Sequence, residues 1–124
     1  IKIKKVGFIE LENIRVYAHH GCLPEETIIG SEYRVDLAVD ADLSVSSESD
    51  ALEDTVDYVT LNTIVVEEMQ KSSKLLEVVA KRIQTEIFKC CPKVNWVSVA
   101  VAKINPPIGG DVEKVVIRLE QGRK

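Results

Sequence analysis

The chain has 124 residues, of which 45% are hydrophobic and 29% charged, and its formal net charge is -4 at pH 7. This length is typical of one domain around a single core, and the composition is that of a folded globule. No apolar run approaches the roughly 18 residues that span a bilayer, and the basic residues 1–5 lead into no signal-peptide core. We therefore expect one domain over residues 1–124, in the cytoplasm and without membrane contact.

The distribution of charge and the cysteine content indicate which binding partners and which cellular compartment to expect. Except for short runs at the two ends, Lys and Arg are scattered along the sequence. The chain therefore has no basic stripe that could bind a nucleic-acid backbone. The three cysteines are an odd number, and the neighbours Cys90 and Cys91 are poorly placed to pair with each other. We expect no nucleic-acid partner and a reducing compartment.

Alternating apolar and polar residues predict two strands in the first half of the chain. From Tyr33 to Leu43 every second residue is apolar, which indicates a strand with one buried and one wet face. The segment Phe8 to Ala18 is its expected partner. The connection from Gly21 to Gly30 is longer than a tight hairpin requires, which makes it a candidate for function.

Two helices are predicted in the middle of the chain. The segment from Ser44 to Asp54 is rich in Ser, Asp and Glu, which is typical of a loop. From about Thr60 apolar residues recur at three- and four-residue spacing, and a second such stripe runs from Leu76 to Ile87. The second helix should end at the Cys91-Pro92 step, because a residue before proline is disfavoured in helix.

Two more strands, Val94 to Lys103 and Val112 to Leu119, are predicted around the turn at residues 105–110. The order strand, strand, helix, helix, strand, strand predicts an α+β domain, in which a four-stranded antiparallel sheet carries both helices on its apolar face. Such an open sheet has two unpaired edges and a wet face. Assembly of several copies into a ring or barrel with a polar lumen would pair the sheet edges and place the polar face in the lumen.

Several chemistries are disfavoured by the residues present. The only histidines are His19 and His20, and successive strand residues point to opposite faces, so one chain cannot build a site from two or three histidines. His20 with Cys22 stays open as the start of a metal site. No glycine-rich phosphate loop precedes a helix, and no serine is marked as a hydrolase nucleophile.

Five segments, in order and spacing, resemble the dihydroneopterin aldolases, and together they cover nearly the whole chain. They are Ile14 to Gly21, Pro24 to Glu26, Asp54 to Tyr58, Leu75 to Glu77, and Lys103 to Pro107. The resemblance implies the tunnelling fold, in which strands and helices follow one another along the chain as ββααββ. It also implies an assembly of four-subunit rings stacked into octamers, with active sites between subunits.

The same resemblance implies an activity of folate biosynthesis. The reaction is retro-aldol cleavage of 7,8-dihydroneopterin, a reduced pterin, to 6-hydroxymethyl-7,8-dihydropterin and glycolaldehyde. It needs no metal, Schiff base or bound cofactor, because the imine of the dihydropterin ring supplies the electron sink. The alternatives are an epimerase acting on dihydroneopterin or its triphosphate, a zinc-dependent pterin synthase of the same fold, and a non-catalytic pterin-binding protein.

Glu77 matches the family glutamate that holds the amino-pyrimidinone edge of the pterin. Two parallel N–H donors of that edge would meet the two carboxylate oxygens, and a ligand without them would leave the charge unpaired. From residues alone, Glu77 is equally an exposed helix residue that pairs with Lys81 one turn on, for about 0.2 to 0.5 kcal/mol.

Lys103 matches the family's general acid-base, although residues alone would make it a solvated lysine at a strand end. The free pKa of lysine is about 10.4, so this role requires a depressed pKa or proton transfer through bound water.

Tyr58 and Glu26 match the family residues that place this water and the hydroxyl side chain of the substrate, often across a subunit boundary. From residues alone, Tyr58 would be a packing residue of the core or of an interface, and Glu26 a solvated residue of a loop. The remaining matches line the pterin through backbone or apolar contact: Thr55, Val56, Leu76 and Cys22.

Overall fold

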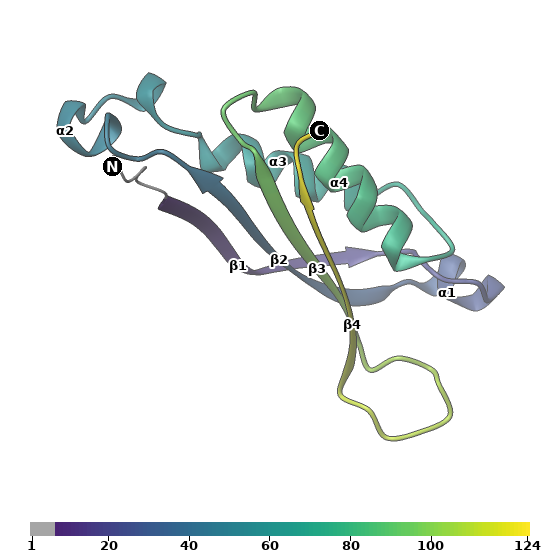
Figure 1. The fold of residues 1–124 in the computed structure, drawn as a ribbon. Helices are drawn as coiled ribbons and strands as arrows, with labels where there is room; N and C mark the ends of the chain where they lie inside the picture. The colour runs from purple at the N-terminus through teal and green to yellow at the C-terminus, as the bar shows by residue number, and fades with distance from the viewer. Residues whose placement is uncertain (1–6) are drawn as a thin grey trace.

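The computed structural model describes residues 7–124, and the basic start at 1–5 lies outside them (Figure 1). The strands are β1 (Gly7–Ala18), β2 (Ser31–Ala41), β3 (Trp96–Ile104) and β4 (Lys114–Gly122). The two long helices are α3 (Tyr58–Met69) and α4 (Leu76–Cys90). The short helical turns are α1 (Pro24–Ile29), α2 (Ser46–Ser49) and the 3-10 turn η1 (Leu52–Asp54).

The strands form one antiparallel sheet in the order β1-β2-β3-β4, with α3 and α4 over one face (Figure 1). The alternation in β2 explains this layering. Tyr33, Val35 and Val39 are fully buried toward the helices, whereas Asp36 on the opposite face is exposed. The apolar stripe of α4 packs on β3 and β4, where Ile83 and Ile87 are also fully buried. The predicted α+β architecture is confirmed.

A β-bulge in β1 changes which residues face the core. The register against β2 shifts between Leu11 and Ile14, and Asn13 takes a positive φ of 57°. The Asn13 amide donates to Oδ1 of Asp36 at 2.8 Å, which satisfies a group that the ladder leaves free. Leu11 and Ile14 both contact the core for this reason, although they are three positions apart.

Several predicted boundaries were wrong by a few residues. The second strand ends at Ala41 rather than Leu43, and the last two strands begin at Trp96 and Lys114. Helix α3 begins at Tyr58, two residues early, because the Asp57 carboxylate accepts from the Val59 amide at 2.9 Å as a side-chain cap. Both predicted loops contain short helical turns, which lack the length for a periodic signal.

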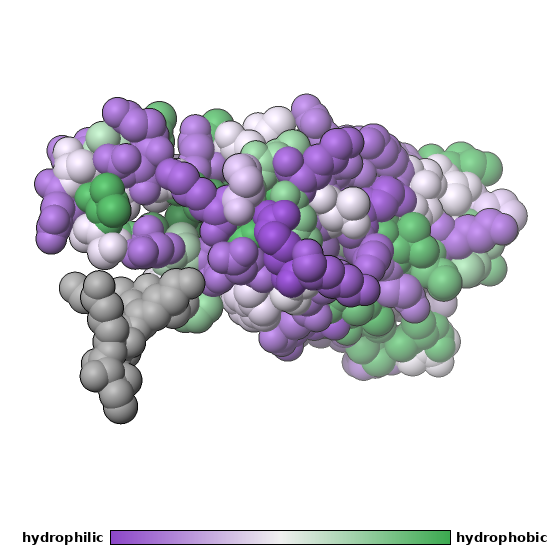
Figure 2. Space-filling model, turned by 45° about the horizontal axis from the view of Figure 1, so that its top comes forward, coloured by the Kyte–Doolittle hydropathy of each residue, from purple (hydrophilic) through white to green (hydrophobic). Residues whose placement is uncertain are grey.

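Exposed apolar side chains occur at both ends of the molecule. In Figure 2 they gather mainly at one end, whereas the end over α2 is mostly hydrophilic with scattered apolar side chains. The end near α1 carries Leu23, Ile28, Ile29 and Leu75, and the end near α2 carries Phe8, Val45, Leu52, Tyr58 and Val59. Within residues 7–124, no helix combines the length and apolarity that crossing a bilayer requires.

Candidate active site

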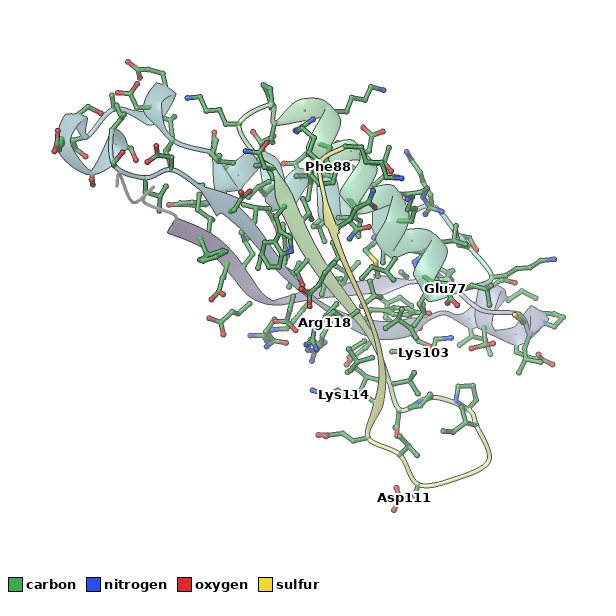
Figure 3. All side chains as sticks on the ribbon, in the orientation of Figure 1. Glu77, Phe88, Lys103, Asp111, Lys114 and Arg118 are labelled. Carbon is green, nitrogen blue, oxygen red and sulfur yellow. The ribbon has the colours of Figure 1, made fainter. Side chains whose placement is uncertain are left out.

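A cavity of about 350 Å³ lies between α1, the start of α4, the end of β3 and the turn that follows β3. Five of the residues selected from the sequence line it: Cys22, Glu26, Leu76, Glu77 and Lys103. The side chains of Glu77 and Lys103 come from α4 and β3 and lie near each other (Figure 3). The structure therefore brings together the two residues on which the predicted chemistry depends.

Lys103 is a buried residue of the cavity lining, with a relative exposure of 7%. It lies opposite Tyr33 in the β2–β3 register, so its side chain projects to the helix-covered face. Its Nζ atom donates to the main-chain oxygen of His20 at 2.9 Å and to Oε2 of Glu26. Nζ also lies over the Tyr33 ring, 5.6 Å from the ring centroid. A buried charge is retained only when it is paired and hydrogen-bonded, and Lys103 meets both conditions.

Gly21 allows Glu26 to reach the lysine. It has a φ of 145°, and a Cβ atom at this position would overlap the Glu26 carboxylate. Oε1 of Glu26 accepts from the Leu23 amide at 3.2 Å, which leaves Oε2 for Lys103. The turn of α1 thus serves to deliver one carboxylate to the ammonium.

The ion pair fixes the charge state of both partners. The hydrogen bond from Lys103 is the main cause that lowers the pKa of Glu26 below its ordinary value. Burial acts to lower the pKa of Lys103, but the hydrogen bond with Glu26 and the nearby Tyr33 outweigh it, so this pKa is raised. Burial also raises the pKa of Tyr33, which keeps its hydroxyl neutral. The depressed lysine pKa considered from the sequence is therefore not what this arrangement produces.

Glu77 stands in the first turn of α4, where the helix dipole favours a negative charge. Its carboxylate has no hydrogen bond or ion pair with any residue between 7 and 124. The alternative partner Lys81 instead donates to Oε1 of Gln121 at 3.3 Å. Glu77 therefore offers two free carboxylate oxygens at the cavity.

The other three predicted residues lie elsewhere in the chain. Thr55, Val56 and Tyr58 line a second, largely apolar cavity of about 520 Å³ beside α2 and the start of α3. Figure 1 shows α1 and α2 at opposite ends of the molecule. Tyr58 is 65% exposed there, so one chain does not bring it to Lys103.

Sequence reasoning missed the groups that hold Lys103 in place. The alternation in its strand predicts only that Tyr33 is a core residue, and the sequence suggests His20 only as a metal ligand. His20 is fully buried, and its Nδ1 atom accepts from the Ser73 amide at 3.1 Å. The Cys22 thiol points instead to the main-chain oxygen of Lys74 at 3.6 Å. The roles of His20 depend on main-chain and tertiary contacts, for which the sequence carries no signal.

Comparison with known proteins identifies the family. The family model described as dihydroneopterin aldolase matches residues 9–120. A dihydroneopterin aldolase of Streptococcus pyogenes serotype M3 is 37% identical over 118 residues, which cover 93% of this chain and 98% of the relative.

Solved structures share the fold at lower identity. The dihydroneopterin aldolase of E. coli in complex with neopterin superposes with a TM-score of 0.83 at 20% identity, covering 94% of this chain and 99% of that one. The enzyme of Burkholderia thailendensis bound to guanine gives 0.77 at 18% identity, covering 96% and 93%.

The fold and these matches define the class as an aldolase, a carbon–carbon lyase. The chain belongs to the dihydroneopterin aldolase family, as the sequence predicts.

Burial of His20 makes the stability of the protein depend on pH. Burial is the main cause that lowers the pKa of its imidazole below the ordinary value of 6.5. Between that lowered pKa and 6.5 the unfolded chain binds more protons than the native one. The free energy of unfolding should then fall as the pH drops through this window, by at most about 1.4 kcal/mol per pH unit.

Urea unfolding at several pH values and one protomer concentration measures this slope. His20→Asn, which removes the titrating group, should flatten the slope just below pH 6.5. The matched change His19→Asn should leave it in place. An unchanged slope in His20→Asn would assign it to other groups.

Proposed function

We propose that this chain cleaves 7,8-dihydroneopterin by a retro-aldol reaction that uses neither a metal nor a Schiff base. The observation that carries the proposal is the shared cavity, in which the buried ammonium of Lys103 lies near the free carboxylate of Glu77. One group is suited to hold a pterin and the other to move protons. The products would be 6-hydroxymethyl-7,8-dihydropterin and glycolaldehyde, for folate synthesis.

In this proposal Glu77 binds the amino-pyrimidinone edge of the substrate. Neopterin and guanine, which are bound by the E. coli and Burkholderia relatives, both present this edge. A carboxylate accepts its two N–H groups in parallel, and such charge-assisted bonds are stronger than neutral ones. Leu76 and Cys22 lie in the same cavity wall and would contact the ring.

The proposed reaction uses Lys103 and Glu26 as a proton-transfer pair. The hydroxyl on the second side-chain carbon, counted from the ring, gives its proton to the Lys103–Glu26 pair through a bound water. The bond between the first and second side-chain carbons then breaks, which releases glycolaldehyde. The electron pair moves into the ring imine, whose nitrogen takes up a proton. The resulting enamine carbon is then protonated by the Lys103 ammonium through a bound water, and the ring nitrogen returns its proton as the imine forms again. Glu26 places the water and the substrate hydroxyl.

The charge state of Lys103 supports a route without a Schiff base. A Schiff base requires a neutral amine as nucleophile, and lysines with that role have lowered pKa values. The pKa of Lys103 is raised through its hydrogen bond with Glu26, so its amine stays protonated near neutral pH. Among residues 7–124, no group of three or more His, Cys, Asp or Glu side chains is arranged to hold a metal ion.

We further propose that a neighbouring subunit completes each site with Tyr58, Thr55 and Val56. Three observations support this. These residues line a separate cavity at the far end of the chain, apolar side chains are exposed at both ends, and β1 and β4 are open sheet edges. The expected assembly is an octamer of two four-subunit rings. We also propose one domain over residues 1–124 in the cytoplasm, where the three free cysteines would remain reduced.

Incubation with 7,8-dihydroneopterin in EDTA tests the reaction and its metal independence together. We expect 6-hydroxymethyl-7,8-dihydropterin and glycolaldehyde in equal amounts, at the rate seen without EDTA. An epimerised pterin without glycolaldehyde would indicate the epimerase, and binding without turnover would indicate a pterin-binding protein. Loss of activity in EDTA that zinc restores would contradict the metal-free route.

Substitutions should separate the roles of the two cavity residues. Lys103→Met keeps a side chain of similar length without the amine. It should lower kcat about 100- to 10,000-fold and leave the Kd for neopterin within a few-fold, as expected for loss of a general acid-base. Glu77→Gln keeps the shape of the side chain without its charge, and should weaken binding about 100-fold. Stopped-flow turnover and fluorescence titration measure both, and interchanged phenotypes would refute the assigned roles.

Mixed oligomers test whether Tyr58 acts across a subunit boundary. Tyr58→Phe and Lys103→Met homo-oligomers should both be nearly inactive. Co-refolded in equal amounts, they should recover activity in about a quarter of the sites, because random pairing then joins an intact Tyr58 with an intact Lys103. A mixture no more active than the separate variants would place both residues in the site of one chain.

A further inference from the structure

His20 makes one hydrogen bond toward each side of the active-site cavity. Its main-chain oxygen accepts from Nζ of Lys103 at 2.9 Å. Its ring Nδ1 atom accepts from the Ser73 amide at 3.1 Å, three residues before α4 begins at Leu76. The side chain is fully buried and does not line the cavity. One residue thus contacts both the general acid-base and the segment that carries Glu77.

The segment around Ser73 is fixed on both of its sides. The Gly21 amide donates to the main-chain oxygen of Ser73 at 2.9 Å, and the amide of the same Ser73 donates to Nδ1 of His20. On the other side, Arg82 of α4 donates to Oγ of Ser73 and to the main-chain oxygen of Lys71 at 2.7 Å. The Arg82 guanidinium is in turn paired with Glu68, whose side chain is only 7% exposed. Displacement of the His20 ring would therefore be transmitted to the start of α4.

The main chain of His20 is equally constrained. The Tyr33 hydroxyl donates to the His20 oxygen at 3.0 Å and lies 3.3 Å from the His20 nitrogen, which donates to it. Tyr33 is fully buried in β2, opposite Lys103 in the sheet register. The carbonyl that accepts from the Lys103 ammonium is thus held by the sheet itself.

We propose that His20 is a positioning residue that sets the separation of Lys103 and Glu77, through its main-chain oxygen on one side and its ring on the other. This inference rests on the proposed roles of those two residues. His20 itself lies outside the cavity lining. Its neutral ring is a hydrogen-bond acceptor, and an error of about 1 Å in the placement of reacting groups is enough to cost about 100-fold in rate.

The two amide side chains provide a matched test, because they place an acceptor at different atoms of the imidazole. The amide oxygen of His20→Asn occupies the position of Nδ1 and can accept from the Ser73 amide. The amide of His20→Gln reaches the position of Nε2 and cannot. His20→Phe keeps the ring volume without an acceptor, and His19→Phe makes the same change one residue away.

The readouts are kcat, the Kd for neopterin by fluorescence titration, and thermal stability. We expect His20→Gln and His20→Phe to weaken neopterin binding and kcat by about tenfold or more, beyond any loss of folded protein. His20→Asn should stay within about threefold of the wild type, and His19→Phe within about twofold. If His20→Phe proves insoluble, the comparison of Asn with Gln still decides the question.

Two outcomes would overturn the inference. One is equal damage by Asn and Gln, which would show that the acceptor position does not matter. The other is lowered thermal stability in His20→Gln with unchanged kcat and Kd, which would make the residue merely structural. Failure of the proposed function is distinguishable, because Glu77→Gln would then bind neopterin as the wild type does. Weakened binding by Glu77→Gln with no effect of His20→Gln would refute the inference alone.

Discussion

A protonated lysine buried at the end of β3 is the constraint around which the active-site end of this protein is built. Removing an ammonium group from water costs several kcal/mol unless hydrogen bonds and an opposite charge replace the lost solvation. Lys103 receives both from Glu26 and the main-chain oxygen of His20. Glycine at position 21 suits this requirement, because a Cβ atom there would overlap the Glu26 carboxylate.

This pairing also bears on the chemistry. Many aldolases activate a lysine as a nucleophile, which requires a neutral amine. Here the carboxylate of Glu26 raises the pKa of Lys103 and keeps it a proton donor. A dihydropterin already contains an imine that can accept the electron pair, so a proton donor is what the reaction requires. The proposed mechanism therefore divides the work between an electron sink in the substrate and proton transfer by the protein.

Under the proposed assembly, a single chain would hold two partial sites rather than one complete one. The polar groups Glu26, Glu77 and Lys103 surround the cavity near α1, whereas Tyr58 lies beside the apolar cavity near α2. The open edges of the sheet and the apolar residues exposed at both ends are the features through which copies would meet. In the proposed assembly the same contacts that stabilise the oligomer would also complete the active sites.

The sequence by itself determined the element order, the core face of β2, and the selection of Glu77 and Lys103. Hydrophobic periodicity and five local segments carry that information, and each is a property of residues near one another in the chain. Only the tertiary structure decided the charge state of Lys103 and the hydrogen bonds that join His20 to Lys103 and Ser73. These depend on main-chain atoms and on segments more than 50 residues apart, where burial strengthens each interaction. No residue pattern records such contacts.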